Sequence, residues 1–246
     1  MSAGTLLPPL WHWLYFLPLH RQSEIGADGH AQRGGFLPPV PLPRRMWAGS
    51  QIEFRSRIRV GDRVARTSTI ADVTVKLGRT GQLAFVKLRH ELRCNDAAEP
   101  ALVEWHDIVY REAPRPGAAL PVPQNAPADA AWRRQIVPDD VLLFRYSALT
   151  FNGHRIHYDR RYVTEVEGYP GLVVHGPLVA TLLLDLLQRH QPGDEVARFH
   201  FKAVRPTFDL HPFDVHARPL PDGKTVHLWA TDHEGWLTMD ATATLR

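Results

Sequence analysis

The sequence lacks several features that identify particular classes of protein. It has one cysteine in 246 residues, Cys94, which excludes an intramolecular disulfide and favours a reducing compartment. The net charge of +3 is too small to indicate nucleic-acid binding, although it would suit an anionic small ligand. The apolar stretch at residues 6–19 is interrupted by prolines, lacks a basic leader and is too short to span a bilayer. We therefore expect a folded cytoplasmic protein with no membrane or nucleic-acid partner.

Two proline-rich segments divide the chain. Residues 113–130, APRPGAALPVPQNAPADA, have no hydrophobic period and are typical of a linker. They separate a first half, residues 1–112, from a second half, residues 131–246. The other segment, FLPPVPLPRR at residues 36–45, favours an ordered loop that leads into a strand over a polyproline recognition motif.

The second half contains the clearest helix, at residues 176–190. Pro177 suits the first helical position, Arg189 and His190 suit the last turn, and Pro192-Gly193 ends the helix. Because the segment is apolar almost all round, we expect it to be buried on most sides. Strands are expected after it at residues 197–204, 214–219, 225–232 and 236–244.

The first half repeats this order. A short aromatic helix or turn at residues 10–17 precedes expected strands at 50–60, 64–75, 83–93 and 101–110. A helix followed by an antiparallel meander, twice, predicts an α+β fold with two tandem sheets, each wrapped around a central helix. That layout is a double hot-dog. In the strand at 50–60, Arg55, Arg57 and Arg59 would share one face, which is either solvated or turned toward an anion.

Residues 151–159, FNGHRIHYD, have the highest density of polar chemistry in the chain. His154 and His157 are three apart, but no further ligand pattern accompanies them, so we expect no metal. A nucleophile is not indicated either. Ser147 lacks the context of a nucleophile elbow, and Cys94 has no histidine motif nearby.

General acid–base chemistry remains. A neutral histidine can move a proton to or from water, and an asparagine can hold water by hydrogen bonds. Eighteen residues after His157 comes His175-Gly176-Pro177, where the first amides of the long helix would stabilise a developing oxyanion. A base, a water-holding group and an oxyanion site are what the addition of water to an α,β-unsaturated thioester requires.

These residues also carry a resemblance to a known family. FNGHRIHYDRRYV, followed by GYPGLVVHGPLVATLLLDLL, resembles the hydratase motif of MaoC-like (R)-specific enoyl-CoA hydratases. It is most similar to the branch with mesaconyl-C4-CoA hydratases, itaconyl-CoA hydratases and type 2 hydroxyacyl-thioester dehydratases. PPLWHWLYFLP at residues 8–18 resembles the first hot-dog of that branch. The resemblance implies a hydro-lyase acting on a short, possibly dicarboxylic, enoyl-CoA thioester, with no cofactor besides the coenzyme A of the substrate.

The resemblance also implies roles in catalysis. His157 falls on the catalytic histidine, and Gly176 falls on the backbone amide that polarises the thioester carbonyl. Asn152 falls where the broader motif has an aspartate, and His154 and Arg155 replace an asparagine and a proline. Either His154 substitutes for the aspartate, or His157 acts as the base while Asn152 orients the water.

Other polar residues have two interpretations each. Asp159 is expected to cap a short helix rather than to act as a catalytic acid. Arg155 either pairs with Asp159 or Glu165 or binds a substrate carboxylate. His175 is either structural or in contact with substrate, and Arg205 either forms a surface salt bridge or reaches the coenzyme A phosphates.

The branch carries a few tens of residues before its aromatic segment, whereas this chain begins close to it. We therefore expect a first hot-dog shortened at its N-terminus, and an exposed edge that favours a homodimer or a higher homo-oligomer. Two other functions are compatible with the sequence. A hot-dog acyl-CoA thioesterase would release free coenzyme A, and a non-catalytic acyl-thioester-binding module would do no chemistry.

Overall fold

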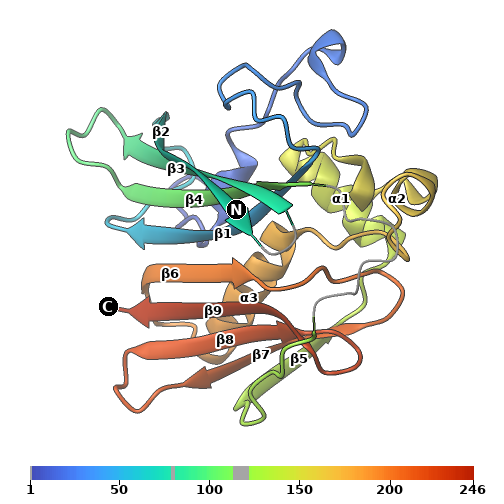
Figure 1. Ribbon diagram of the computed structural model, residues 1–246. Helices are drawn as coiled ribbons and strands as arrows, with labels where there is room; N and C mark the ends of the chain where they lie inside the picture. The colour runs from blue at the N-terminus through green and yellow to red at the C-terminus, as the bar shows by residue number, and fades with distance from the viewer. Residues whose placement is uncertain (1, 79–80, 113–121) are drawn as a thin grey trace.

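The architecture is one antiparallel sheet with a long helix packed against one end of it (Figure 1). The computed structural model describes residues 2–78, 81–112 and 122–246. Within these ranges nine strands form the sheet, in the order β2-β3-β4-β1-β6-β9-β8-β7-β5. The strands are β1 Arg44–Phe54, β2 Val64–Gly78, β3 Gly81–Cys94, β4 Leu102–Arg111, β5 Trp132–Ile136, β6 Val196–Ala203, β7 Phe213–Pro219, β8 Thr225–Thr231 and β9 Leu237–Leu245. The helical segments are η1 Trp11–Leu14, η2 Gln22–Glu24, α1 Asp140–Thr150, η3 Arg155–His157, α2 Arg160–Glu165 and α3 Gly176–His190.

The second half is a complete hot-dog. Helix α3 begins and ends at the predicted residues, with Pro177 in its first turn, and it packs against β5, β7, β8 and β9. Leu183 on this helix is fully buried, as are Val215 and Leu228 on the strands that it contacts. Burial of this apolar surface is the main stabilising contribution in this half.

The first half contributes strands β1 to β4 and joins the second through β1, which pairs with both β4 and β6. In the part of the chain that the structure describes, this half has no counterpart of α3. The aromatic segment at residues 10–17 forms only the four-residue 3-10 helix η1. Long loops between η1 and β1 cover the sheet instead (Figure 1). The predicted central helix of the first hot-dog is therefore reduced to a single turn.

One strand is displaced from its expected position. Strand β1 begins at Arg44 and ends at Phe54, so the expected strand at 50–60 and its face of three arginines are wrong. Arg55 instead pairs with Glu53, Arg57 pairs with Glu195, and the Arg59 guanidinium donates to the backbone of the N-terminal segment. The segment at 36–43 is an ordered loop that leads into β1, as predicted.

The predicted linker lies partly outside the described residues, at 113–121. Its remainder is attached to the second half, because Leu237 N–H donates to the carbonyl of Gln124 and Asn125 forms a bridge with Trp236. The domain boundaries stay predictions. No helix in the described ranges is both long enough and apolar enough to cross a membrane.

Candidate active site

A large cavity lies between the two halves. Its walls are the inner faces of β1, β3 and β4, the loop before β1, the end of α1, η3 and the start of α3. It has a volume of about 2560 Å³, whereas small-molecule pockets usually measure roughly 300–1,000 Å³. His154, His157 and Gly176 line it together. The space that a second long helix would fill is thus continuous with the predicted catalytic residues.

His157 is held by the segment that leads into α3. Its Nδ1–H donates to the carbonyl of Val173 at 2.7 Å, and Val173 N–H donates to the carbonyl of Ile156 at 2.9 Å. Because a carbonyl can only accept, the first bond places the proton of the neutral ring on Nδ1 and leaves a lone pair on Nε2. No hydrogen bond to Nε2 occurs among the described residues. The ring is therefore prepared to accept a proton at that atom.

The surroundings of His157 keep it neutral. Burial lowers its pKa from 6.5 to about 4, and the Val173 carbonyl opposes this shift only in part. The ring of His175 stacks on it with centroids 3.8 Å apart. His175 is itself completely buried, and its Nε2 shares a 2.8 Å hydrogen bond with the hydroxyl of Ser147. His175 thus packs against the His157 ring and holds it in place. This agrees with the structural interpretation of His175 rather than with contact to substrate.

Gly176 begins helix α3 at the wall of the cavity. Its amide is one of the unpaired N–H groups of the first turn, and Pro177 has no N–H to compete with it. The first turn contains no acidic side chain, so nothing there offsets the positive end of the helix dipole. The position fits the predicted oxyanion site.

Asn152 and His154 lie in the turn after α1. The Asn152 Oδ1 accepts a 3.0 Å hydrogen bond from the backbone N–H of His154, so this oxygen stabilises the turn and the amide NH₂ remains for water. His154 is half-buried, and burial lowers its pKa to about 2. Its ring centroid lies 5.3 Å from that of His157. The roles of Asn152, His154, His157 and Gly176 in catalysis stay predictions.

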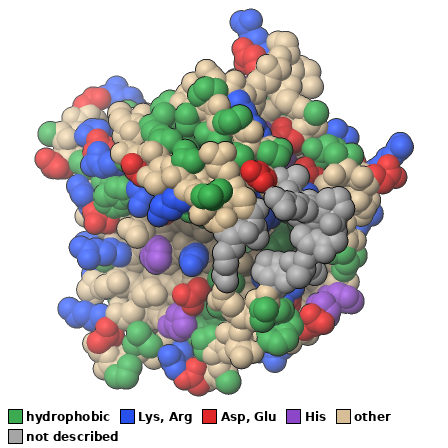
Figure 2. All heavy atoms as spheres, viewed as in Figure 1, with side chains coloured by type: hydrophobic (Ala, Val, Ile, Leu, Met, Phe, Trp, Pro, Cys, Tyr) green, Lys and Arg blue, Asp and Glu red, His purple; other side chains and the backbone are tan. Residues whose placement is uncertain are grey.

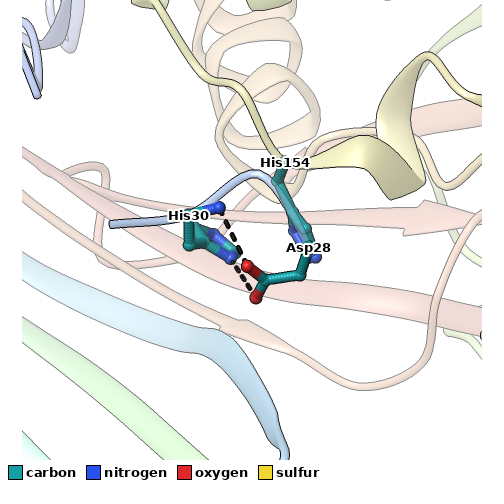
Figure 3. Close-up of side chains that lie close together, drawn as sticks. All are labelled: Asp28, His30 and His154. Atoms are coloured by element: carbon teal, nitrogen blue, oxygen red, sulfur yellow. Dashed lines mark hydrogen bonds and ion pairs between the residues drawn. The ribbon is translucent and has the colours of Figure 1, made fainter. Parts of the chain in front are cut away.

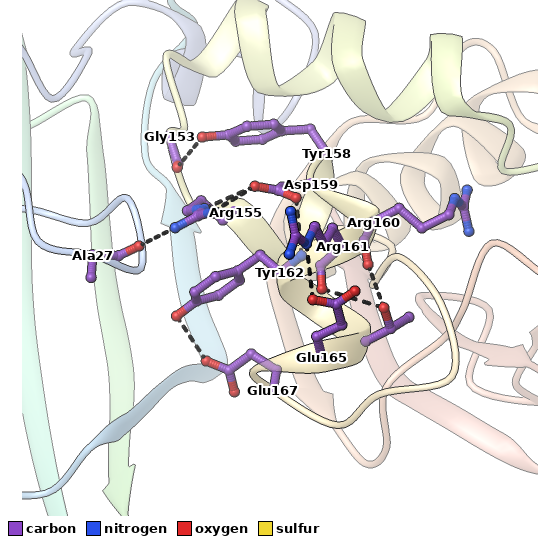
Figure 4. A network of polar contacts seen from close by, with 11 residues as sticks. Ala27, Gly153, Arg155, Tyr158, Asp159, Arg160, Arg161, Tyr162, Glu165 and Glu167 are labelled. Atoms are coloured by element: carbon purple, nitrogen blue, oxygen red, sulfur yellow. Dashed lines mark hydrogen bonds and ion pairs between the residues drawn. The ribbon is translucent and has the colours of Figure 1, made fainter.

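Arg155 pairs with Asp159, one of its predicted partners (Figure 4). Its Nε and Nη2 donate to one carboxylate oxygen of Asp159 at 3.0 and 2.8 Å, and its Nη1 donates to the carbonyl of Ala27 at 3.0 Å. The guanidinium also lies 4.1 Å from the ring centroid of Tyr162. Because each nitrogen already has a partner, Arg155 is a poor candidate for a substrate carboxylate.

The prediction for Asp159 is confirmed. Its other carboxylate oxygen accepts from Tyr162 N–H at 3.0 Å and caps α2. Arg205, which also lines the cavity, forms a half-buried ion pair with Asp232 at 3.3 Å. This ion pair is one of the two interpretations of Arg205, and contact with coenzyme A stays a prediction.

Two residues of the site were not predicted. Asp28 and His30, in the loop between η2 and β1, reach His154 across the junction of the halves (Figure 3). The signal was present in the sequence as DGH, an acid and a histidine around a glycine. Only the fold brings these residues to the second half, more than 120 positions away in the chain.

Solved structures show which class of fold the chain has. Among solved structures, a MaoC-like dehydratase superposes with a TM-score of 0.66 at 15% identity, over 85% of this chain and 77% of the other. A conserved hypothetical protein of Mycobacterium tuberculosis with a double hot-dog fold gives a TM-score of 0.52 at 14% identity, over 82% of this chain and 75% of the other. The predicted α+β double hot-dog fold is confirmed.

The family follows from sequence comparison. The profile of hydroxyacyl-thioester dehydratase type 2 matches residues 10–209, and the chain belongs to this family. Mesaconyl-C(4)-CoA hydratase of Chloroflexus aurantiacus is 48% identical over 252 residues, which cover 99% of this chain and 85% of the relative. The predictions of the family and of an enzyme of the hydratase and dehydratase class are confirmed.

Proposed function

We propose that the protein is a hydro-lyase that adds water reversibly to the double bond of a short enoyl-CoA thioester of the mesaconyl-C4-CoA or itaconyl-CoA type. The observation that carries this proposal is the pairing of His157, neutral and fixed through Nδ1, with the free amide of Gly176 in one cavity. The identity of 48% to a mesaconyl-C(4)-CoA hydratase supports the substrate class.

The reaction needs only groups that line the cavity. The amide of Gly176 stabilises the thioester oxygen as it gains enolate character. His157 Nε2 takes a proton from the water that attacks the β-carbon, and the α-carbon then receives a proton. We propose that no metal or redox cofactor takes part, since the thioester itself makes the α-carbon acidic.

A dicarboxylic acyl group needs a cation for its far carboxylate. Arg45, on β1, lines the cavity and lies close enough to His30, His106 and His154 to lower the pKa of each. It forms no ion pair with any residue that the structure describes, in contrast to Arg155. We therefore assign the substrate carboxylate to Arg45 in place of Arg155.

We also propose that the enzyme is a homodimer. Strand β2 is the edge of the sheet, and its side chains Val73, Val75 and Leu77 are 47%, 58% and 88% exposed. Figure 2 shows hydrophobic side chains among charged ones over the part of the surface that the first half's sheet forms. A long exposed edge strand with apolar side chains favours pairing with a second copy. Light scattering would give twice the chain mass of 27.9 kDa.

A substrate panel tests the function. Purified protein should hydrate mesaconyl-C4-CoA or itaconyl-CoA, seen as loss of the enoyl absorbance, and release no free thiol. His157→Ala should lower kcat by roughly 10²–10⁴-fold, the usual contribution of a general base. His200→Ala, an exposed histidine on β6, is the matched control and should keep the wild-type rate.

Three outcomes contradict the proposal. Release of free coenzyme A would indicate a thioesterase. Tight binding without turnover would indicate an acyl-thioester-binding module. Equal rates of wild type and His157→Ala would remove the proposed base.

A further inference from the structure

The N-terminal segment reaches into the candidate site as a tight turn. Residues 26–30 close on themselves, because Gly26 N–H donates to the carbonyl of His30 and Gly29 N–H donates to that of Gly26. Asp28 and His30 both line the cavity. This turn belongs to the first half of the chain, but it lies against the loop that carries His154 (Figure 3).

The turn is fixed to the second half by backbone contacts. Arg155 N–H donates to the carbonyl of Asp28 at 2.9 Å, and the Arg155 side chain donates to that of Ala27 at 3.0 Å. A Cβ atom at Gly29, where φ is +87°, would overlap the carbonyl oxygen of Gly153. The two backbones therefore touch at a point where only glycine fits. Such a contact holds the side chains on either side of it in register.

Asp28 accepts two hydrogen bonds from His30. One carboxylate oxygen accepts from the backbone N–H of His30 at 3.0 Å, and the other accepts from the ring Nδ1–H at 3.1 Å. An ionised carboxylate can only accept, so the proton of the neutral ring lies on Nδ1 and the lone pair on Nε2. No partner for Nε2 occurs in the described ranges.

His30 is held in the same way as His157. Each ring is fixed through Nδ1 by an oxygen acceptor, and each lines the same cavity with Nε2 unpaired. His154 lies between them, with its centroid 3.9 Å from His30 and 5.3 Å from His157. One difference is electrostatic, because the acceptor of His30 is a carboxylate and would stabilise an imidazolium.

We propose that His30 is the second proton-transferring residue of the hydration and that Asp28 is its positioning partner. The inference rests on the proposed function. As the water oxygen bonds to the β-carbon, one water proton passes to His157 Nε2 and the π electrons move to the thioester enolate. That proton then passes by way of His154 or cavity water to Nε2 of the neutral His30. The His30 imidazolium so formed gives the proton to the α-carbon and becomes neutral, so no net proton is gained or lost.

The pair of Asp28 and His30 offers a replacement for the aspartate that the broader family motif has at the position of Asn152. An asparagine cannot exchange protons, and its oxygen already serves the turn. The first half supplies an acid–base group in its place. Burial lowers the pKa of His30 below its usual value, the Asp28 hydrogen bond opposes this only in part, and the charges of Arg45 and Arg33 lower it further. The protonation of His30 therefore depends on Asp28.

Hydrogen exchange at the α-carbon separates the two histidines. In deuterium oxide, His157→Gln should stop hydration but still exchange the α-hydrogen of the 3-hydroxyacyl-CoA product. His30→Gln should lose both reactions, with kcat lowered by roughly 10²–10⁴-fold. Asp28→Asn should lower kcat by about 10–100-fold and move the acid limb of the pH profile downward, and Asp28→Glu should restore part of both.

A second histidine–aspartate pair provides the control. His227 Nε2 and Asp240 lie 2.7 Å apart on β8 and β9, outside the walls of the cavity. His227→Gln and Asp240→Asn should keep the wild-type rate and pH profile, which shows that loss of such a pair is not harmful in itself.

Several results would overturn the proposal. If wild type is active and His30→Gln retains α-hydrogen exchange or more than half of kcat, the proposal fails while the proposed function stands. One equivalent of bound metal in wild type, lost in both His30→Gln and Asp28→Asn, would make Asp28, His30 and His154 ligands instead. A wild type that is inert toward the whole panel would refute the proposed function itself.

Discussion

The two halves of the molecule are built on similar sheets and use their interiors differently. In the second half, α3 fills the space against the sheet, and Leu183, Val215 and Leu228 are fully buried. In the first half the corresponding space is open to the cavity, and polar residues such as Glu104 and His106 line it. The second half therefore supplies most of the apolar core and the helix that begins at the proposed oxyanion site, while the first half supplies most of the open space of the cavity.

Glu104 shows how the first half tolerates polar groups in its interior. The carboxylate is 3% exposed and accepts from Ser50 at 2.8 Å, from Trp13 at 3.1 Å and from His12 at 3.2 Å. Burial alone would raise its pKa, but these partners hold the pKa at about 2. A buried charge with three partners is permitted where an unpaired one would be costly.

The same substitution in each half should have unequal effects on stability. Leu183→Ala removes a fully buried side chain from the larger core, with an expected loss of about 4 kcal/mol in the free energy of unfolding. Leu88→Ala, on β3, enlarges a cavity that already exists and should cost only about 2 kcal/mol. Urea unfolding of the two variants measures this. Equal losses would mean that the first half is as tightly packed as the second.

Acid should destabilise both halves through one histidine in each. Burial lowers the pKa of His106 and of His157 from 6.5 to about 4. Between these values the unfolded chain binds more protons than the native protein, so stability rises with pH and is lost as pH falls. From pH 7 to pH 5 each histidine should cost roughly 2 kcal/mol.

His106→Gln and His157→Gln should each reduce that acid dependence by a similar amount, measured by urea unfolding at both pH values. A variant that keeps the full dependence would show that its histidine titrates normally in the native state.

Substitutions on the two edge strands of the sheet should have little effect on stability but unequal effects on dimerisation. The first half ends at β2, with 15 residues, whereas the second ends at β5, with five. Val75→Lys on β2 should weaken dimerisation by about 10-fold or more, because a charge at an edge strand opposes edge-to-edge pairing. Gln135→Lys, at an exposed position on β5, should leave it unchanged. Light scattering over a dilution series measures both, and a dimer insensitive to Val75→Lys would place the interface elsewhere.

The sequence predicted what local signals determine. Helix α3 has Pro177 at its start and a continuous apolar surface, and its bounds were predicted to the residue. Strand β1 was displaced because its ends depend on pairing with β4 and β6, which lie far away in the chain. His157 and Gly176 could be predicted because the family motif that they match lies within one short stretch of the sequence. Asp28 and His30 were missed because their neighbours in space belong to the other half.

The contact between Gly29 and Gly153 joins the N-terminal loop of the first half to the candidate site in the second half. Departure of the turn at residues 26–30 from the site would break the close backbone contact and the two bonds to Arg155, whereas the pairing of Asp28 with His30 lies within the turn. Release of this turn would expose the cavity and at the same time remove one of its two proposed proton carriers. Access to the site and assembly of its chemistry are thereby joined in one short segment.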